Sequence, residues 1–485
     1  MNNDDSQVDQ LRFLIGGAWR PSISGHEIPN VNPATGEPLG RVAVAGEEDI
    51  DAAVRAARAS FERGSWRDMP PGERAATMRR AADILAKRTD ALAETMTAEL
   101  GCTITFAERV QVPSPIQTLR YFADLAENYQ WEEERVGGNG RSLVRRQPVG
   151  VVAAITPWNA PLHSPMIKLA PALAAGCSIV HKPSTLTPLT GALLFEALQE
   201  AGVPDGVVNY VPGEQEAGRR LVAHPDVDKI AFTGSTAVGR AIMAVAAQRI
   251  ARVTLELGGK SAAIMLPDCD TETFVDGVLR MGILLNSGQV CHCQSRLLVP
   301  NERYDEVAEL LTERARAARV GDPFDRHTVV GPLVSEAQRA RVEGYIESGV
   351  AEGASITTGG RRPPGLERGW FVEPTVFTNV SRDLKIAQEE IFGPVAVVIR
   401  YTDENEAVEI TNDTSYGLSG SVWSQDRERA LRIARRLRTG SVSINGAPQS
   451  DTAPRGGFKQ SGIGREAGPE GLERYTEVQS IAASP

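Results

Sequence analysis

The chain has 485 residues, of which 24% are charged and 41% hydrophobic, the composition of an ordinary globular protein. A chain of this length is too long for one hydrophobic core, so two or three domains are expected. The 62 acidic and 52 basic residues give a formal net charge of −10, which disfavours a nucleic-acid scaffold because phosphate binding requires a basic face.

Secretion and insertion into a membrane are disfavoured as well. The segment Met1–Ser6 is polar and acidic, without the basic and then apolar order of a signal peptide. The longest apolar run, Val149–Ile155, is soon followed by Pro157 and is far too short to span a bilayer. Five cysteines, an odd number without the spacing of a disulfide framework, favour a reducing compartment. We therefore expect a cytoplasmic protein.

The first elements in chain order are short strands and turns, followed by a helix. Residues 13–19 and 32–36 have the composition of short strands and turns. Apolar residues from Ile50 to Phe61 recur on one helical stripe, and three acidic residues at 47–49 fill the first turn.

Apolar runs farther along the chain predict the strands of a parallel sheet. Residues 148–155 and 177–182 are expected as buried strands joined by apolar helical stretches, and residues 229–233 continue the series. A second α/β pattern begins after Lys260 and extends to about Ser461. The pattern is that of a doubly wound sheet followed by a second α/β unit.

Residues 131–146 interrupt this order. Two strand-like arms flank Gly137–Gly140, which is a strong signal for a β-hairpin. An isolated hairpin is only marginally stable in water, so this one must pair with another strand, and a partner subunit is one candidate.

A carboxylate and a thiol in two glycine-marked turns are the most informative residues. Glu256 lies in the segment LELGGKS (255–261), and about thirty residues later Cys291 lies in SGQVCHCQSR (287–296). Covalent catalysis through a cysteine, followed by hydrolysis of the thioester, requires such a pair. The alternative for Cys291 is a small buried hydrophobic residue, as most free cysteines are.

Both segments closely resemble the glutamate and cysteine motifs of the aldehyde dehydrogenase superfamily, and the resemblance continues to Tyr475–Val478. It implies an α/β, aldehyde dehydrogenase-like fold with two doubly wound parallel-sheet domains and a small β domain for oligomerisation. The last strand of that small domain would extend from Tyr475 to about Ala482. The implied division of the chain is residues 1–124 with 148–259 for the dinucleotide, 260–460 for catalysis, and 125–147 with 461–485 for assembly into a homodimer or homotetramer.

The resemblance implies NAD(P)-dependent oxidation of a small-molecule aldehyde to a carboxylic acid. Cys291 would attack the carbonyl, and the side-chain amide of Asn159 with the backbone N–H of Cys291 would stabilise the oxyanion. Hydride transfer would leave a thioester, which water activated by Glu256 would hydrolyse. Lys168 and Glu466 match a lysine and a glutamate that the family places behind this base as a proton route. A structural role in a turn is the alternative for Asn159.

The segment FTGSTAVG (232–239) places two glycines between a strand and a helix, where free N–H groups suit a pyrophosphate. The usual G-x-G-x-x-G fingerprint is absent, but aldehyde dehydrogenases bind their dinucleotide with this variant. By the same resemblance, Glu390 and Phe392 would hold the nicotinamide ribose. The implied cofactor residues are Thr156, Pro157, Trp158, Lys182, Thr185, Gly218, Phe232, Gly234, Ser235, Leu257, Glu390 and Phe392.

Thr185 leaves the choice between NAD and NADP open. Members of the family that prefer NAD commonly carry a glutamate three positions after the lysine that matches Lys182, and this glutamate would repel a 2′-phosphate. Threonine can bind a ribose hydroxyl without repelling phosphate, so we expect NAD as cofactor, with NADP possible. Without the family, a solvated lysine at the end of a strand would be the simpler interpretation of Lys182.

The implied substrate tunnel departs from the family's pattern at two places. Many members carry aromatic residues where this chain has Ala160 and Arg455, so we expect a roomier or more polar entrance. A structural ion pair is the alternative role for Arg455. The implied tunnel residues are Ala160, His163, Ser164, Ile167, Val290, His292 and Arg455.

The residues that follow Cys291 have simpler interpretations than a second site. Cys293 is expected to pack in the interior, with a disulfide to Cys291 under oxidation as the alternative. His292 is not expected to pair with Cys291, because adjacent side chains usually diverge and the family uses no histidine there. No metal site is expected, because Cys-His-Cys lacks the spacing and the second ligand cluster of a zinc site.

Two rival functions are possible on this fold. A CoA-acylating semialdehyde dehydrogenase would typically lack the hydrolytic glutamate, which this chain has at Glu256. A non-catalytic structural or binding relative would be favoured by loss of Cys291, Glu256 or Asn159, and all three are present.

Overall fold

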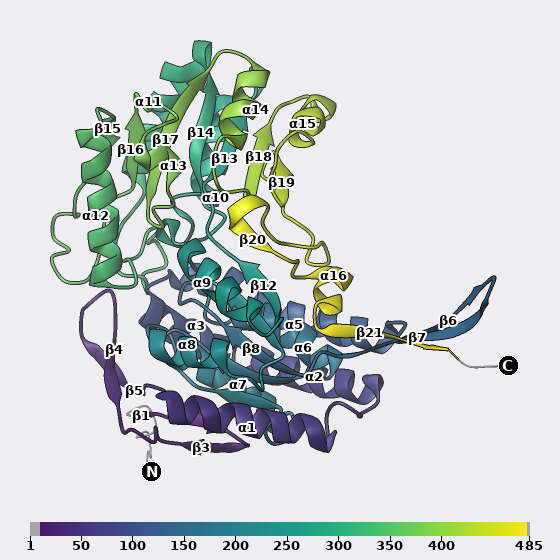
Figure 1. Ribbon diagram of the computed structural model, residues 1–485. Helices are drawn as coiled ribbons and strands as arrows, with labels where there is room; N and C mark the ends of the chain where they lie inside the picture. The colour runs from purple at the N-terminus through teal and green to yellow at the C-terminus, as the bar shows by residue number, and fades with distance from the viewer. Residues whose placement is uncertain (1–9, 483–485) are drawn as a thin grey trace.

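The computed structural model describes residues 10–482 and contains two large sheets and two small ones (Figure 1). Residues 1–9, on which the expectation of no signal peptide rests, and residues 483–485 lie outside the described residues. No helix within residues 10–482 is long and apolar enough to cross a membrane.

The first large sheet is mostly parallel and has its reversal of strand order in the middle. From β8 the chain proceeds through β9 to β10 on one side and then returns to place β11 and β12 on the other side. Strands β2, β3 and β20 join its edges in antiparallel pairings. In order across the sheet the strands are β20 (Gly462–Ile463), β12 (Arg252–Glu256), β11 (Lys229–Thr233), β8 (Val151–Ile155), β9 (Ser178–Lys182), β10 (Val208–Tyr210), β2 (Phe13–Ile15) and β3 (Ala18–Arg20).

Both faces of this sheet are covered, which explains why its central strands are apolar throughout. Val151, Ala153 and Ile155 of β8 face one core, and Val152 and Ala154 face the other. The first core is completed by α1 (Glu47–Arg63), α8 (Gln215–Ala223) and α9 (Thr236–Ala247). The second is completed by α2 (Pro71–Lys87), α3 (Thr89–Leu100), α5 (Pro113–Asn128), α6 (His163–Ala175) and α7 (Leu189–Glu200).

The second large sheet has the same layered construction. Alternate residues of β13 face two separate cores, and only the pairing of β15 with β16 is antiparallel. Its strands, in order, are β15 (Ser355–Thr358), β16 (Thr375–Thr378), β17 (Val395–Tyr401), β14 (Gln294–Pro300), β13 (Ser261–Met265), β18 (Ser419–Trp423) and β19 (Ser441–Ile444). The helices around it are α10 (Thr271–Met281), α11 (Tyr304–Ala317), α12 (Glu336–Ala351), α13 (Lys385–Gln388), α14 (Glu404–Asn412) and α15 (Arg427–Ala434).

The predicted hairpin is present as β6 (Glu132–Gly137) and β7 (Gly140–Pro148), and Figure 1 shows it extending away from the body of the chain. The last strand, β21 (Thr476–Ala482), pairs antiparallel with β7, as expected for the C-terminal strand. Within segment 461–485, β20 pairs instead with β12 of the first sheet. The division of the chain into domains stays a prediction.

The remaining elements are short. The N-terminal sheet contains β1 (Gln10–Leu11), β5 (Pro38–Ala43) and β4 (Glu27–Val31). The helix predicted around residues 50–61 is α1, in which Ile50, Val54 and Ala57 are buried and Phe61 is half-buried. The other short helices are α4 (Ile104–Phe106), the π-helix η1 (Ala107–Gln111), η2 (Leu285–Gly288), η3 (Asn301–Arg303), η4 (Lys459–Ser461) and α16 (Gly468–Glu473).

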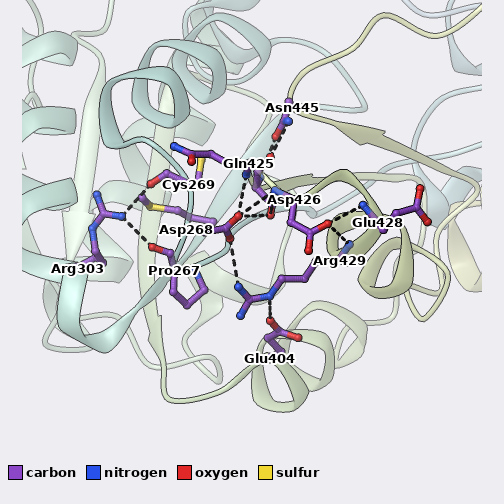
Figure 2. A network of polar contacts seen from close by, with 12 residues as sticks. Pro267, Asp268, Cys269, Arg303, Glu404, Gln425, Asp426, Glu428, Arg429 and Asn445 are labelled. Carbon is purple, nitrogen blue, oxygen red and sulfur yellow. Dashed lines mark hydrogen bonds and ion pairs between the residues drawn. The ribbon is translucent and has the colours of Figure 1, made fainter.

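A polar network around Asp268 closes the carboxyl edge of the second sheet beside β13 and β18 (Figure 2). Asp268 Oδ2 accepts hydrogen bonds from the Ser424 hydroxyl at 2.7 Å and from the next two backbone N–H groups at 2.9 and 3.0 Å. Arg429 bridges Asp268 and Glu404. Burial opposes ionisation of Asp268, but these hydrogen bonds outweigh it and lower the pKa of the carboxyl.

We predict that Asp268→Ala lowers the free energy of unfolding by about 2 kcal/mol at neutral pH, because charged hydrogen bonds lose their acceptor. Since the folded protein holds this carboxyl at a lowered pKa, its contribution to stability is lost as the pH falls through that pKa. Urea unfolding at several pH values measures the difference. The exposed Asp383→Ala is the matched control, and equal effects of the two substitutions would contradict the role of the network.

Candidate active site

The candidate residues come from loops at the facing edges of the two large sheets, which Figure 1 shows one above the other. Asn159 follows β8 and Glu256 ends β12, both at the carboxyl edge of the first sheet. Cys291 precedes β14, and Glu390 and Phe392 precede β17, at the amino edge of the second sheet. Open α/β sheets bind ligands at the carboxyl edge where the strand order reverses, which is here between β8 and β11.

The short crossing Leu257–Lys260 from β12 to β13 is held at every residue. The N–H of Leu257 donates to the carbonyl of Ser461 at 2.9 Å, and the Ser461 hydroxyl donates to the carbonyl of Gly258 at 2.7 Å. The N–H of Gly259 donates to Glu390 Oε1 at 3.1 Å. The buried Arg296 donates from Nε to the carbonyl of Lys260 at 2.9 Å, so the strand after Cys291 holds the loop after Glu256.

Cys291 is presented by an unusual left-handed turn. Asn286, Ser287 and Gly288 have φ values of +49°, +56° and +71°, a region that side chains other than glycine rarely adopt. A Cβ atom at position 288 would overlap the carbonyl oxygen of Gly393, so glycine is required there. Such strain, about 1–3 kcal/mol per residue, is characteristic of functional sites.

Of the five cysteines, all within the described residues, Cys291 is partly exposed and the other four are buried. Protein atoms nevertheless surround the sulfur, and this burial, with the negative charges of Glu390 and Glu256, raises the pKa of the Cys291 thiol to about 12. The thiol is therefore protonated at rest. Cys293 is buried, as expected for a packing residue.

The expectation that His292 diverges from Cys291 is wrong. Nδ1 of His292 lies 3.9 Å from the sulfur, within reach of a weak hydrogen bond. Both residues lie in a turn and not in a strand, so consecutive side chains do not alternate between opposite faces.

Asn159 is buried against the turn that carries Cys291. Its Nδ2 donates to the carbonyl of Gln289 at 3.0 Å, and its backbone carbonyl accepts from Gln111 Nε2 at 3.2 Å and Asn286 Nδ2 at 3.3 Å. Because an amide nitrogen carries two N–H bonds, Nδ2 can also donate to a second acceptor.

Glu256 has a buried carboxyl group whose Oε1 has no hydrogen-bond partner among the described residues. Burial raises its pKa well above the ordinary value, the charge of Glu466 adds to this, and Lys168 opposes it. Lys168 and Glu466 form a buried ion pair, so the structure brings the three residues together. A Cβ atom at Gly456 would lie 2.8 Å from Oε1 of Glu256.

The first turn of α9 forms the candidate pyrophosphate site. Ser235 is its N-cap, and the Ser235 hydroxyl accepts from the N–H of Val238 at 3.4 Å. Ser235 and Val238 are both exposed, so the N-terminus of this helix is open. Gly234 lies against the ring of Phe232, and Leu257 packs under α9 at Gly239.

Lys182 at the end of β9 is buried, so the alternative of a solvated lysine is wrong. Its ammonium donates to the carbonyls of Pro183 at 2.9 Å and of Gly213. Burial lowers the pKa of Lys182 to about 8. A Cβ atom at Gly218 would lie 3.7 Å from Lys182 Cε, and Thr185 is half-buried three residues farther on.

The candidates for the nicotinamide end come from both sheets. Trp158 and Phe392 meet edge to face, with ring centroids 5.3 Å apart. Pro157, which precedes Trp158, is half-buried, and Thr156 is buried with its hydroxyl 2.9 Å from His181 Nε2. Burial raises the pKa of Glu390 to about 7.

The candidate tunnel residues divide into two groups by exposure. Ala160, His163, His292 and Arg455 keep accessible surface, whereas Ser164, Ile167 and Val290 are buried. Arg455 does form an ion pair, at 3.5 Å from Asp451, whose carboxylate is itself largely exposed. Within the described part of the chain, no three His, Cys, Asp or Glu side chains are grouped to hold a metal ion.

Two glutamines that position Asn159 were not predicted. Gln289 lies inside the cysteine motif, two residues before the thiol, and that position was a usable signal. In the structure Gln289 is buried, and its Oε1 accepts from the N–H of Val334 at 3.0 Å. Gln111 ends the π-helix η1, and nothing in its composition marks residues 107–111 as a π-helix. Such helices occur frequently at functional sites.

The sequence profile of the aldehyde dehydrogenase family matches residues 19–481. The chain belongs to this family. The resemblance stated for residues 255–261 and 287–296 is thereby confirmed, and so is the prediction of an oxidoreductase of the aldehyde dehydrogenase class.

Three relatives in the family have different named substrates. The geranial dehydrogenase of Castellaniella defragrans is 46% identical over 98% of this chain and 99% of that protein. The 3-succinoylsemialdehyde-pyridine dehydrogenase of a Pseudomonas species is 43% identical over 98% of both chains. The betaine aldehyde dehydrogenase of Bacillus subtilis is 41% identical over 97% of this chain and 96% of that protein.

Solved structures of aldehyde dehydrogenases share the whole fold. The Mycobacterium tuberculosis enzyme complexed with NAD+ has a TM-score of 0.96 at 45% identity, over 98% of this chain and 99% of that one. The NAD+ complex of the Bacillus cereus enzyme has a TM-score of 0.96 at 41% identity, over 100% and 99%. The predicted aldehyde dehydrogenase-like α/β fold is therefore confirmed.

We predict that iodoacetamide alkylates Cys291 of the cofactor-free enzyme about tenfold faster with each pH unit between pH 7 and 10. The reason is that only the thiolate reacts, and a pKa of about 12 keeps its fraction small throughout this range. Peptide mass spectrometry would follow modification at position 291. A rate that is flat above pH 7 would contradict the protonated resting state.

Proposed function

We propose that this enzyme oxidises an aldehyde to a carboxylic acid with NAD as hydride acceptor, through a thioester on Cys291. The observation that carries the proposal is the pair formed by the partly exposed residue Cys291 and the unpartnered, buried Oε1 of Glu256, whose charge acts on the Cys291 thiol. A buried carboxyl group with a raised pKa and a free oxygen is suited to act as a general base at neutral pH.

The residues present fit a dinucleotide. The open N-terminus of α9, with Ser235 exposed, offers N–H groups to a pyrophosphate, and Lys182 lies at the end of β9 for a ribose. Trp158 would line the nicotinamide side, and Glu390 and Phe392 would hold the nicotinamide ribose. NAD, when bound, supplies the hydride acceptor.

In the first half of the reaction Cys291 would attack the aldehyde carbon and form a thiohemiacetal. The developing oxyanion would accept hydrogen bonds from Nδ2 of Asn159 and from the backbone N–H of Cys291. The hydrogen bond from Nδ2 of Asn159 to Gln289 holds its side-chain amide against the cysteine turn in advance, and the bond from Gln111 holds its backbone carbonyl. With the thiol proton released to water, loss of hydride from this adduct would leave the thioester.

In the second half Glu256 would take a proton from water, which then attacks the thioester and releases the acid. The buried Lys168–Glu466 pair lies behind Glu256 and would relay the proton outward. The presence of Glu256 disfavours CoA-acylating chemistry, and the intact set of Cys291, Glu256 and Asn159 disfavours a non-catalytic role.

We also propose that the chain forms a homo-oligomer, a dimer or a tetramer, through the sheet of β6, β7 and β21. Val136 and Val478 of this sheet are 69% and 59% exposed, so these apolar side chains are not covered by the same chain. The unpaired edge strand β19 borders a groove of about 620 Å³.

Five free cysteines favour a reducing compartment, for which the cytoplasm is the default.

We predict that Glu256→Gln forms the thioester but hydrolyses it slowly, because an amide cannot take the proton from water. Rapid mixing with aldehyde and NAD should give a burst of reduced cofactor and then a steady state about a hundredfold or more below wild type. Cys291→Ala should show neither phase while binding NAD within a few-fold, and Cys293→Ala should keep most activity. An unchanged steady state in Glu256→Gln would mean that another group is the base.

We predict that wild type prefers NAD but accepts NADP measurably, and that Thr185→Glu excludes NADP. A carboxylate about 4 Å from a 2′-phosphate costs on the order of 4 kcal/mol at an effective dielectric of 20, whereas threonine adds no charge. Thr185→Gln, which adds the same bulk without charge, is the control. Values of kcat/KM for both cofactors decide the matter, and rejection of NADP by several orders of magnitude in wild type would assign discrimination to another residue.

A further inference from the structure

Three side chains that can donate hydrogen bonds lie on three separate segments beside the candidate catalytic residues, in sequence or in space. His163 begins α6 four residues after Asn159, and His292 follows Cys291 with its ring 3.9 Å from the sulfur. Arg455 immediately precedes Gly456, the residue in contact with Glu256. All three donors keep accessible surface, so they lie at the open side of the site.

The backbone of Arg455 is fixed while its guanidinium is poorly partnered. Its N–H donates to the carbonyl of Glu466 at 2.6 Å, and the N–H of Glu466 donates back at 2.8 Å. The Nε atom is buried and has no hydrogen-bond partner within the described residues. The ion pair with Asp451 is 3.5 Å long, and the Asp451 side chain is 58% exposed. An exposed pair of this kind contributes little stability and is easily exchanged for another anion.

Arg455 is the cation of this group. Burial and the charge of Arg455 lower the pKa of His163 to about 4, and the same charge acts on the more exposed His292 in the same direction, so both rings contribute neutral N–H donors at neutral pH. A guanidinium with a free Nε–H and a weakly held Nη suits two-point binding of a carboxylate.

We propose that this group, His163, His292 and Arg455, binds an anionic substituent of the substrate, so that the preferred aldehydes carry a carboxylate. The inference rests on the proposed function, because it takes Cys291 as the reacting group. The carboxylate would displace Asp451 from Arg455 and satisfy its unpartnered Nε–H, with the histidines as further donors.

Turnover of matched aldehydes tests the proposal. With NAD, wild type is expected to show kcat/KM at least tenfold higher for succinate semialdehyde than for butanal, and for formylbenzoate than for benzaldehyde. Arg455→Met should reduce each ratio at least tenfold, mainly through KM of the acid, and Arg455→Lys should restore part of it. Asp451→Asn should increase the ratios because it removes the competing carboxylate, and the exposed Arg438→Met is the matched control.

A second measurement needs no dehydrogenase activity. Iodoacetate is an anion and iodoacetamide is neutral, and both alkylate Cys291, so the ratio of their rates reports the charge that surrounds the thiol. Arg455→Met should lower this ratio at least threefold, with Arg438→Met unchanged and the thermal midpoint of each variant confirming the fold.

The outcomes distinguish failure of the proposed function from failure of the anionic site. A wild type that oxidises aldehydes but prefers the neutral member of both pairs, or an Arg455→Met variant whose turnover ratios stay within twofold, overturns the anionic site alone. A wild type that oxidises no aldehyde while its alkylation ratio still depends on Arg455 overturns the proposed function and leaves the anionic site supported. An alkylation ratio that does not depend on Arg455 counts against the anionic site in either case.

Discussion

The four residues Leu257–Lys260 fix the geometry on which the rest of the site depends. They carry the chain from the carboxyl edge of the first sheet to the amino edge of the second, and each is hydrogen-bonded to a segment that also holds a candidate residue. Ser461 ties the crossing to the segment after Arg455, Glu390 ties it to the cofactor side, and Arg296 ties it to the strand after Cys291. Because the crossing is so short, neither sheet can shift without moving the thiol relative to Glu256.

The burial of these groups between the two sheets determines their charge states in the resting enzyme. Burial raises the pKa values of Cys291, Glu256 and Glu390 and lowers that of Lys182. The thiol is therefore favoured in its neutral form before substrate and cofactor arrive, and Glu256 takes up a proton more readily than a solvated carboxylate. A thiol that stays protonated is less exposed to oxidation, since the thiolate is the reactive form. Activation of the nucleophile then becomes a consequence of binding and not a permanent property of the empty site.

Sequence reasoning succeeded where local pattern and chemistry coincide. The hairpin signal at Gly137–Gly140, the apolar runs of β8 and β9, and the motifs around Glu256 and Cys291 all depend on neighbouring residues, so one sequence displays them. The family resemblance supplied the remaining assignments, and the structure places Lys168 and Glu466 beside Glu256, although they are distant in sequence.

What the sequence missed depends on conformation or on contacts between remote segments. Nothing in the residue types of Asn286 and Ser287 requires two consecutive left-handed residues, and nothing in those of Cys291 and His292 indicates the turn that keeps their side chains 3.9 Å apart. The π-helix that aims Gln111 at Asn159 likewise has no compositional signature. The contact of Gly456 with Glu256 joins residues two hundred positions apart in sequence (456 − 256), beyond the reach of any local pattern.

The Asp268 network has a consequence for how the two halves of the molecule can change. In the second sheet the carboxyl edge, where open α/β sheets usually bind ligands, is occupied by the protein's own carboxylate and arginine side chains (Figure 2). The chemistry lies at the opposite ends of the same strands. Rigidity and turnover are therefore assigned to different ends of one sheet, so the enzyme can be made more heat-resistant at one end without retuning its reaction at the other.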